Sequence, residues 1–174
     1  MKLRRKRGRK FKIEDSINKF LTGDTQQNAL NFAKHVGSLG MTVRGGGDGG
    51  GRVFYKGKTI CDLHISGDYA GYPGPWTIWI YWTQPESVPN DERFMEIVWA
   101  NIDHCINCVG GNNEWCKSDI KKKTIFGRDF DNVCQAAIAF TDPNAEAVEC
   151  AKKLIEMRKH AIEIMKHTDK KASE

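Results

Sequence analysis

Hydrophobic positions along the chain follow two periods, and their order predicts the fold class. Helical spacing recurs in three segments and strand-like alternation in three others. The strand-like segments are framed by helices, which favours an α+β domain: an antiparallel or mixed sheet with helices packed on one face and a cysteine-rich loop after the middle helix. The helical segments are 24–39, 91–103 and the stretch after Asp142, and the strand-like segments are 52–65, 76–82 and 133–140.

The ends of the predicted helices carry recognisable start signals. Asp24 with Gln27 three residues later has the spacing of a capping box, which predicts a helix start there. The middle helix is expected from Asp91 to Asp103 and to run straight into the cysteine cluster. Asp142 followed by proline predicts the start of a long final helix.

The strand segments contain one hairpin signal and one strand with bulky residues on both faces. Lys56-Gly57-Lys58 separates two alternating runs, which predicts a tight turn. Between Trp76 and Trp82 every other residue is apolar on one face, while the opposite face carries Trp79 and Tyr81. Such a strand is expected to be central or partly covered. The glycine run 45–51 leads into a strand rather than a helix, so it predicts a flexible strand connection and not a phosphate-binding loop.

Charge separates a tail from a body. The net charge is +5, but eight of the 27 basic residues fall within the first twelve positions, where there is no acid; the remaining 19 basic residues face 22 acidic ones, a net charge of −3. The sequence therefore predicts a disordered basic tail at 1–13, a single domain at 14–166 and a flexible C-terminus at 167–174. Such a tail can bind nucleic acid or simply remain solvated.

The chain is expected to be soluble and cytoplasmic. The basic start is followed by polar residues rather than the apolar run of a secretory signal, and no segment approaches the about twenty apolar residues of a membrane span. A reducing compartment disfavours structural disulfides, so the six cysteines are expected to bind metal, do redox chemistry or pack in the core.

A cysteine cluster is the most specific chemical signal. Cys105 and Cys108 form a C-x-x-C pair, and Gly110-Gly111 lets the chain turn back to Cys116. Cys134 is the expected fourth ligand of a zinc ion, and His104 is a less favoured alternative because it is adjacent to Cys105. No second metal-ligand pair accompanies the first. Buried thiols and a redox pair are the alternatives, and Cys61 and Cys150 are better explained by core packing.

Aromatic residues predict a second candidate site. Their density on and around strand 76–82 suggests a pocket able to hold a flat or cationic small molecule, although rings also fill ordinary cores. The candidate ligand-binding residues are Tyr55, Trp76, Trp79, Tyr81 and Trp82.

Two segments resemble a known group of proteins. KKKTIFGRDFDNVC (121–134) and DPNAEAVECAKKLIEMRKHAI (142–162) are similar to a family of small uncharacterised bacterial proteins, whose related segments are also attached to helix-turn-helix regulators. The similarity covers most of the body but not the tail. In that family the cluster is tighter and richer in glycine, whereas here NNEWCKSDIK precedes the KTIFG motif. The resemblance implies a sensing or effector-binding module by analogy.

These observations predict a small-molecule binding or sensing module, zinc-stabilised through the cysteine cluster, with no membrane association. A nucleic-acid-associated protein that uses residues 2–12 is one alternative. A thiol-dependent enzyme is another, with Cys108 or Cys116 as nucleophile and His64 or His104 as base, although an enzyme is the less favoured reading.

Overall fold

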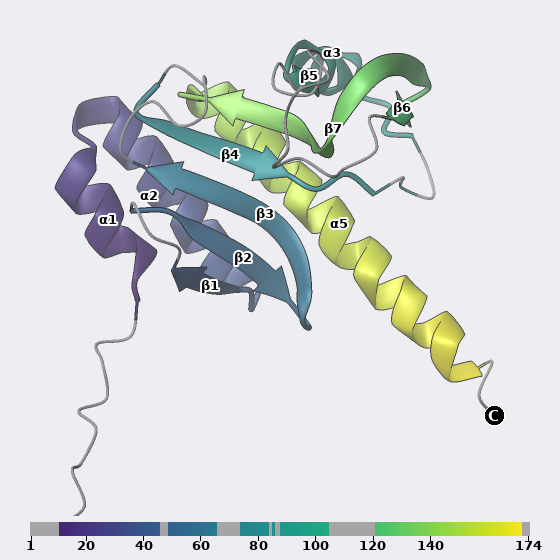
Figure 1. Ribbon diagram of the computed structural model, residues 1–174, viewed down its shortest axis with the longest axis horizontal. Helices are drawn as coiled ribbons and strands as arrows, with labels where there is room; N and C mark the ends of the chain where they lie inside the picture. Colours follow the sequence, from purple (N-terminus) through teal and green to yellow (C-terminus); the bar gives the residue numbers. More distant parts are fainter. Residues whose placement is uncertain are drawn as a thin grey trace, which may run out of the picture.

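The computed structural model describes residues 11–45, 49–65, 74–83, 85, 88–104 and 121–171, and it confirms the α+β class. Figure 1 shows the sheet in front of α2 and α5, with α1 to its left and α3 beside its upper edge. The helices are α1 (Ile13–Phe20), α2 (Gly23–Ser38), α3 (Glu92–Ala100) and α5 (Ala145–Lys171). The strands are β1 (Thr42–Gly45), β2 (Gly51–Tyr55), β3 (Lys58–Ile65), β4 (Trp76–Ile80), β5 (Ile102–His104), β6 (Lys121–Ile125) and β7 (Arg128–Thr141).

One sheet contains all seven described strands. Its order is β1-β2-β3-β4-β7-β5, with β6 also paired to β7, and every described strand pair is antiparallel. The sheet is therefore antiparallel rather than mixed. β4 lies between β3 and β7, which confirms its prediction as a central strand.

The β2–β3 hairpin has the predicted turn and one irregularity. Lys56 and Gly57 both have positive φ, 46° and 81°, as a two-residue hairpin turn requires. Beyond the turn the register shifts by one residue, so that Val53 pairs with Cys61 and Ile60 is the extra residue of a β-bulge. The bulge fixes which residues of β3 share a face with those of β2.

Apolar side chains on the rear face of the sheet and on the helices form the core. α5 contacts β3 and β4, α1 contacts β3, and α2 packs against both α1 and α5. In the described part of the chain no helix has the length and apolar character needed to cross a membrane. The largest fully buried side chains include Phe32, Val53, Ile78, Ile80, Val98, Ile138, Phe140 and Ile155.

Three helices differ at their ends from the sequence-based expectations. α2 begins at Gly23 and its N-cap, Thr22, makes no side-chain capping bond, so the predicted capping box at Asp24 is wrong. α3 is capped by Asp91 but ends at Ala100, because the next residues pair with β7 as β5 instead of continuing the helix. α5 is capped by Asn144, which accepts a hydrogen bond from the backbone N–H of Ala147 at 2.9 Å, and it runs to Lys171, beyond residue 166.

The β6–β7 hairpin was missed because its sequence is rich in lysine. The sequence analysis predicted a strand in this region only at 133–140, yet β6 pairs with the first half of β7. Its turn is formed by Phe126 and Gly127, whose φ angles are 49° and 76°. Ile125 and Phe126 are buried, which anchors the hairpin to the core.

Candidate functional site

The two faces of β4 separate the predicted aromatic residues. Trp76, Ile78 and Ile80 are 0–2% exposed and belong to the core. Trp79 and Tyr81 alternate with them and are partly exposed. Trp76 is therefore a core residue and not part of an accessible pocket.

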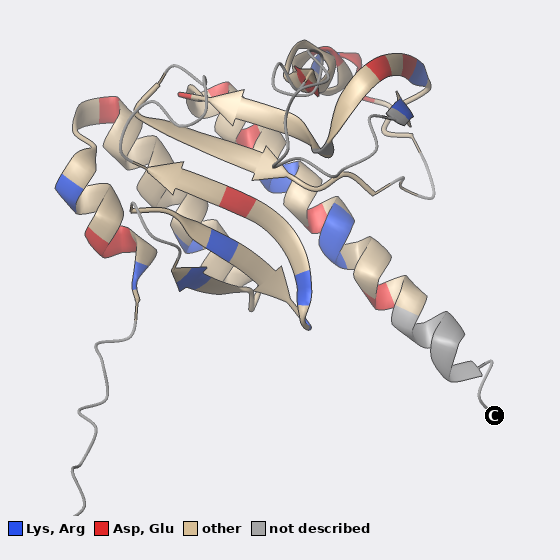
Figure 2. Ribbon diagram, viewed as in Figure 1, with Lys and Arg blue, Asp and Glu red and all other residues tan. Residues whose placement is uncertain are grey.

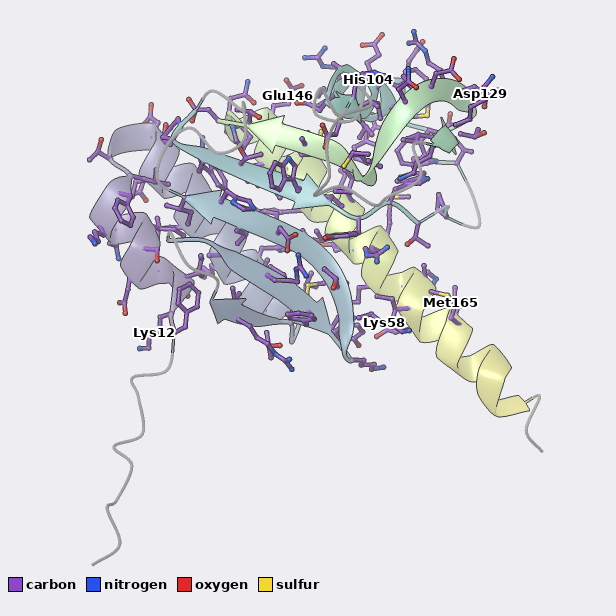
Figure 3. All side chains as sticks on the ribbon, viewed as in Figure 1. Lys12, Lys58, His104, Asp129, Glu146 and Met165 are labelled. Atoms are coloured by element: carbon purple, nitrogen blue, oxygen red, sulfur yellow. The ribbon has the colours of Figure 1, made fainter. Side chains whose placement is uncertain are left out.

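Two further predicted residues also lie away from Trp79. The Tyr55 hydroxyl donates to Glu163 of α5, and Lys159 lies over the Tyr55 ring, so this tyrosine joins the β2–β3 hairpin to the helix. Trp82 packs edge-on against Phe126, with ring centroids 4.9 Å apart. Figure 3 labels Lys58 at the tip of the β2–β3 hairpin and Met165 on the outer half of α5. Only Trp79 and Tyr81 of the five candidates share a surface.

That surface, which we call the polar face, is the side of the sheet that faces the viewer in Figure 1. Its residues alternate with the buried ones on β2, β3 and β4, and the register aligns Arg44, Arg52, Asp62 and Trp79 in one row across four strands. The described members of the polar face are Thr42, Arg44, Arg52, Phe54, Asp62, His64, Thr77, Trp79 and Tyr81.

A three-residue hydrogen-bonded group occupies the middle of the polar face. Arg52 donates two hydrogen bonds to Asp62, from Nε to Oδ1 at 2.6 Å and from Nη2 to Oδ2 at 3.0 Å. Tyr81 donates its hydroxyl to Oδ2 of the same carboxylate at 3.1 Å. The Asp62 side chain is 14% exposed and that of Arg52 is 52% exposed, so the pair is anchored at the carboxylate and open at the guanidinium. The two hydrogen bonds therefore hold the planar guanidinium group of Arg52 in a fixed orientation.

The Tyr81 hydroxyl keeps its proton at neutral pH and can donate it in a hydrogen bond. Burial, followed by the nearby charge of Asp62, raises the pKa of Tyr81 to about 12. The phenol therefore remains protonated at neutral pH and continues to donate to the carboxylate.

An aromatic pair adjoins this group. The rings of His64 and Trp79 lie 4.4 Å apart at 60°. Burial lowers the pKa of the His64 imidazole, an effect that Asp62 partly opposes. At neutral pH His64 is thus uncharged, and the pair offers ring surface rather than a cation.

Access to the polar face is greatest at its β1–β2 side. Thr77 on β4 is only 4% exposed, and His64 and Trp79 are partly buried. Arg44 on β1 is exposed and its guanidinium carbon lies 4.7 Å from the centre of the Phe54 ring. Among the described residues, the polar face is therefore most exposed over β1 and β2.

Arg158 braces the group from α5. Its guanidinium donates to the carbonyl of Thr59 at 2.7 Å, to the carbonyl of Trp82 at 3.4 Å and to the hydroxyl of Thr83. Its guanidinium carbon also lies 5.8 Å from the centre of the Tyr81 ring. Burial lowers the pKa of Arg158. This arginine joins the helix to the ends of β3 and β4 next to Tyr81.

Only one of the four predicted zinc ligands belongs to the residues that the structure describes. Cys105, Cys108 and Cys116 lie outside the described residues, whereas Cys134 lies on β7 and is partly buried. The described residues that flank the cysteine segment, His104 and Lys121, both pair with Val133, the residue before Cys134. His104 and Lys121, the described residues on either side of the cysteine segment, thus both lie beside the start of the chain stretch that carries Cys134.

The side chain of His104 contacts a backbone carbonyl group. Its Nδ1 lies 3.1 Å from the carbonyl oxygen of Asp131. Figure 3 shows His104 at the same end of the molecule as Asp129, next to the β6–β7 turn. Within the described ranges no group of three or more His, Cys, Asp and Glu side chains could hold a metal ion.

The other cysteines behave as packing residues, as predicted. Cys61 and Cys150 are 0% and 5% exposed. Burial raises the pKa of both thiols, which keeps them protonated at neutral pH. Neither has the lowered pKa of an activated nucleophile.

Sequence reasoning missed the Arg52–Asp62 pair. The polar–apolar alternation of β2 and β3 marks both residues as surface positions, but their pairing depends on the bulge at Ile60.

Comparison of the chain with protein-family models, with curated proteins and with solved structures found no match.

Proposed function

We propose that this protein is a binding module for a small planar molecule, and that the polar face is its binding surface. The observation that carries the proposal is the row in which a partly exposed ring, Trp79, neighbours the Arg52–Asp62 pair. A planar ring would stack on Trp79 and its neighbour His64, while its polar edge would meet the open side of Arg52.

The chemistry of these groups favours a ring with hydrogen-bonding edges. The exposed part of the Arg52 guanidinium offers donors, and its orientation is fixed by the carboxylate behind it. Tyr81 holds the same carboxylate from the other side. Preorganised polar groups beside an aromatic surface are typical of small-molecule sites.

Nuclear magnetic resonance can test this with the wild-type protein. The indole N–H signals of Trp79 and Trp99 would be followed while adenosine, riboflavin or indole-3-acetate is added. We expect at least one probe to shift the Trp79 signal. Trp99 is the internal control, because its Nε1 donates to the carbonyl of Ile125 at 2.8 Å, away from the polar face.

The Asp62→Asn variant sharpens the test. The amide removes the charge that fixes Arg52 but keeps the side-chain shape, so probe affinity should fall while the fold is retained. No shift of Trp79 with any probe, or equal shifts of Trp79 and Trp99, would contradict the proposal.

We also propose that Cys105, Cys108, Cys116 and Cys134 hold a zinc ion that stabilises the module. The support is that His104 and Lys121, the described residues that flank the cysteine segment, both pair with Val133, the residue before Cys134. Four thiolates form the tetrahedral ligand set of structural zinc sites.

Elemental analysis of protein purified without added metal or chelator tests this proposal. Wild-type protein should contain about one zinc per chain, and Cys134→Ser should lose most of it. Cys150→Ser is the matched control, since Cys150 is buried in the core at α5, and it should keep its metal. Metal-free wild-type protein would refute the zinc site.

A further inference from the structure

The polar face carries net positive charge on the side where it is most exposed. Arg44 and Arg52 are register partners on β1 and β2, and Asp62 is the one acid among the described residues of the face. Figure 2 shows blue segments on β1 and β2 beside a red segment on β3. Two arginines and one aspartate give a net charge of +1, because His64 is uncharged at neutral pH. The described residues of the face therefore leave one positive charge unbalanced.

Arg44 carries the unbalanced charge. Its guanidinium carbon lies 4.7 Å from the centre of the Phe54 ring, and the attraction between a cation and an aromatic face holds the group over β2. Within the described ranges no carboxylate forms an ion pair with Arg44. A ring contact does not use the N–H donors of a guanidinium group, so these donors remain available to an anion.

Arg52 presents a second set of donors on the same side of the face. Asp62 accepts hydrogen bonds from Nε and Nη2 of Arg52, so Nη1 is not used by this carboxylate. The Arg52 side chain is 52% exposed. A guanidinium group that is held by one carboxylate and is open on its other side can bind a second carboxylate in a defined geometry.

The row across the sheet sets the size of the ligand. Asp62 lies between Arg52 and Trp79 in this row, and its carboxylate holds the Arg52 guanidinium toward β3. Trp79 is on the next strand, about 4.8 Å further on. A planar ring and a carboxylate that are joined by one or two carbon atoms have a separation of this order, so one small molecule can contact both residues.

We propose that the polar face selects planar aromatic carboxylates, with the ring stacked on Trp79, the carboxylate bound at the open side of Arg52, and Arg44 adding the charge that attracts the anion. This inference rests on the proposed ring-binding function and names its ligand class. Cationic rings are disfavoured, because both arginines repel them and Asp62 already has partners.

A matched series of indoles tests the charge preference while the ring stays the same. Indole-3-acetate is an anion, indole-3-ethanol is neutral and tryptamine is a cation. Each is added to nitrogen-15-labelled full-length protein while the indole N–H signal of Trp79 is followed. Indole-3-acetate should bind about fivefold more tightly than indole-3-ethanol, in keeping with the modest strength of exposed ion pairs, and tryptamine should bind most weakly. Added NaCl should narrow the difference, because salt screens exposed charges.

The Arg44→Gln variant isolates the contribution of the unbalanced charge. It should reduce the preference for indole-3-acetate over indole-3-ethanol to about twofold or less, because one of the two attracting cations is removed. Arg93→Gln on α3 is the matched charge control and should keep the full preference, since Arg93 pairs with Glu146. Circular dichroism of each variant checks that the fold is retained.

The outcomes distinguish this inference from the proposed function. Equal binding of indole-3-acetate and indole-3-ethanol at Trp79 would support ring binding but would refute the charge selection. Tighter binding of tryptamine, or an unchanged preference in Arg44→Gln, would also overturn the inference. If indole-3-acetate does not shift the Trp79 signal, the inference is wrong, and a Trp79 shift with adenosine or riboflavin would then still support the proposed function.

Discussion

Replacement of Arg158 by methionine should destabilise the protein, because this side chain connects α5 to the ends of two strands. Its guanidinium makes three hydrogen bonds, to the carbonyls of Thr59 and Trp82 and to the hydroxyl of Thr83. Methionine keeps most of the aliphatic packing but removes all the donors.

The magnitude follows from the type of bond. A hydrogen bond from a charged group contributes about 1.5–3 kcal/mol, but the desolvation that lowers the pKa of Arg158 offsets part of this sum. Water can also reach the partly exposed site after substitution. We therefore expect a net loss of about 2–3 kcal/mol, which corresponds to a fall in Tm of roughly 4–12 °C for a chain of this size.

Urea unfolding followed by far-ultraviolet circular dichroism measures this loss. Arg158→Lys should lie between wild type and Arg158→Met, since one ammonium group cannot reach all three acceptors in the same geometry. Arg93→Met, at an exposed arginine of α3, is the matched control and should leave the midpoint unchanged. An Arg158→Met midpoint equal to that of wild type would refute the bracing role.

Three further predictions concern other described contacts. Because burial depresses the pKa of His64 below its unfolded value, folding stability should fall as the pH drops below about 6.5, and His64→Gln should lessen that fall in urea unfolding at pH 7, 6 and 5; equal pH dependence of both proteins would contradict this. Asn144→Ala removes the cap that binds the N–H of Ala147 and should cost about 1 kcal/mol in the same assay, and an unchanged midpoint would show that the cap is dispensable. Tyr55→Phe should raise the pKa of Glu163, which the Tyr55 hydroxyl lowers more than any other group; carboxyl-carbon resonance titration measures it, and an unshifted titration would argue against the contact.

Elements with a strong period were predicted well. The alternation at 76–82 correctly placed Trp76, Ile78 and Ile80 on one face and Trp79 on the other, because a strand exposes alternate residues on opposite faces. The turn at Lys56-Gly57 was also correct, since its glycine accommodates positive φ.

The two strands that the sequence did not predict, β5 and β6, form because of tertiary contacts with β7. Ile102 of β5 continues the apolar spacing of α3 in sequence, and only pairing with β7 makes residues 102–104 a strand. In β6, Lys122 is exposed and Lys123 partly buried, while the last residue of the strand, Ile125, is buried. Local composition could not distinguish such a strand from a loop.

The candidate site was half predictable. Trp79 and Tyr81 were found from alternation, but the sequence could not say which face the helices cover, so Trp76 and Tyr55 were grouped with them. Arg52 could not be matched to Asp62 by counting from the hairpin turn. A regular hairpin would place Cys61 opposite Arg52, and the bulge moves the register by one.

The bulge at Ile60 also separates the register of the hairpin tip from the register of the rest of β3. Removing Ile60 would restore a regular ladder from the turn to Val53–Cys61, with every later residue of β3 still on its present side. Adding or removing a residue beyond Cys61 would instead turn Asp62 and His64 inward and Leu63 outward. A one-residue deletion before Cys61 would therefore keep the register of the polar face but remove the buried Ile60 side chain from the core, whereas a deletion after Cys61 would invert the face itself.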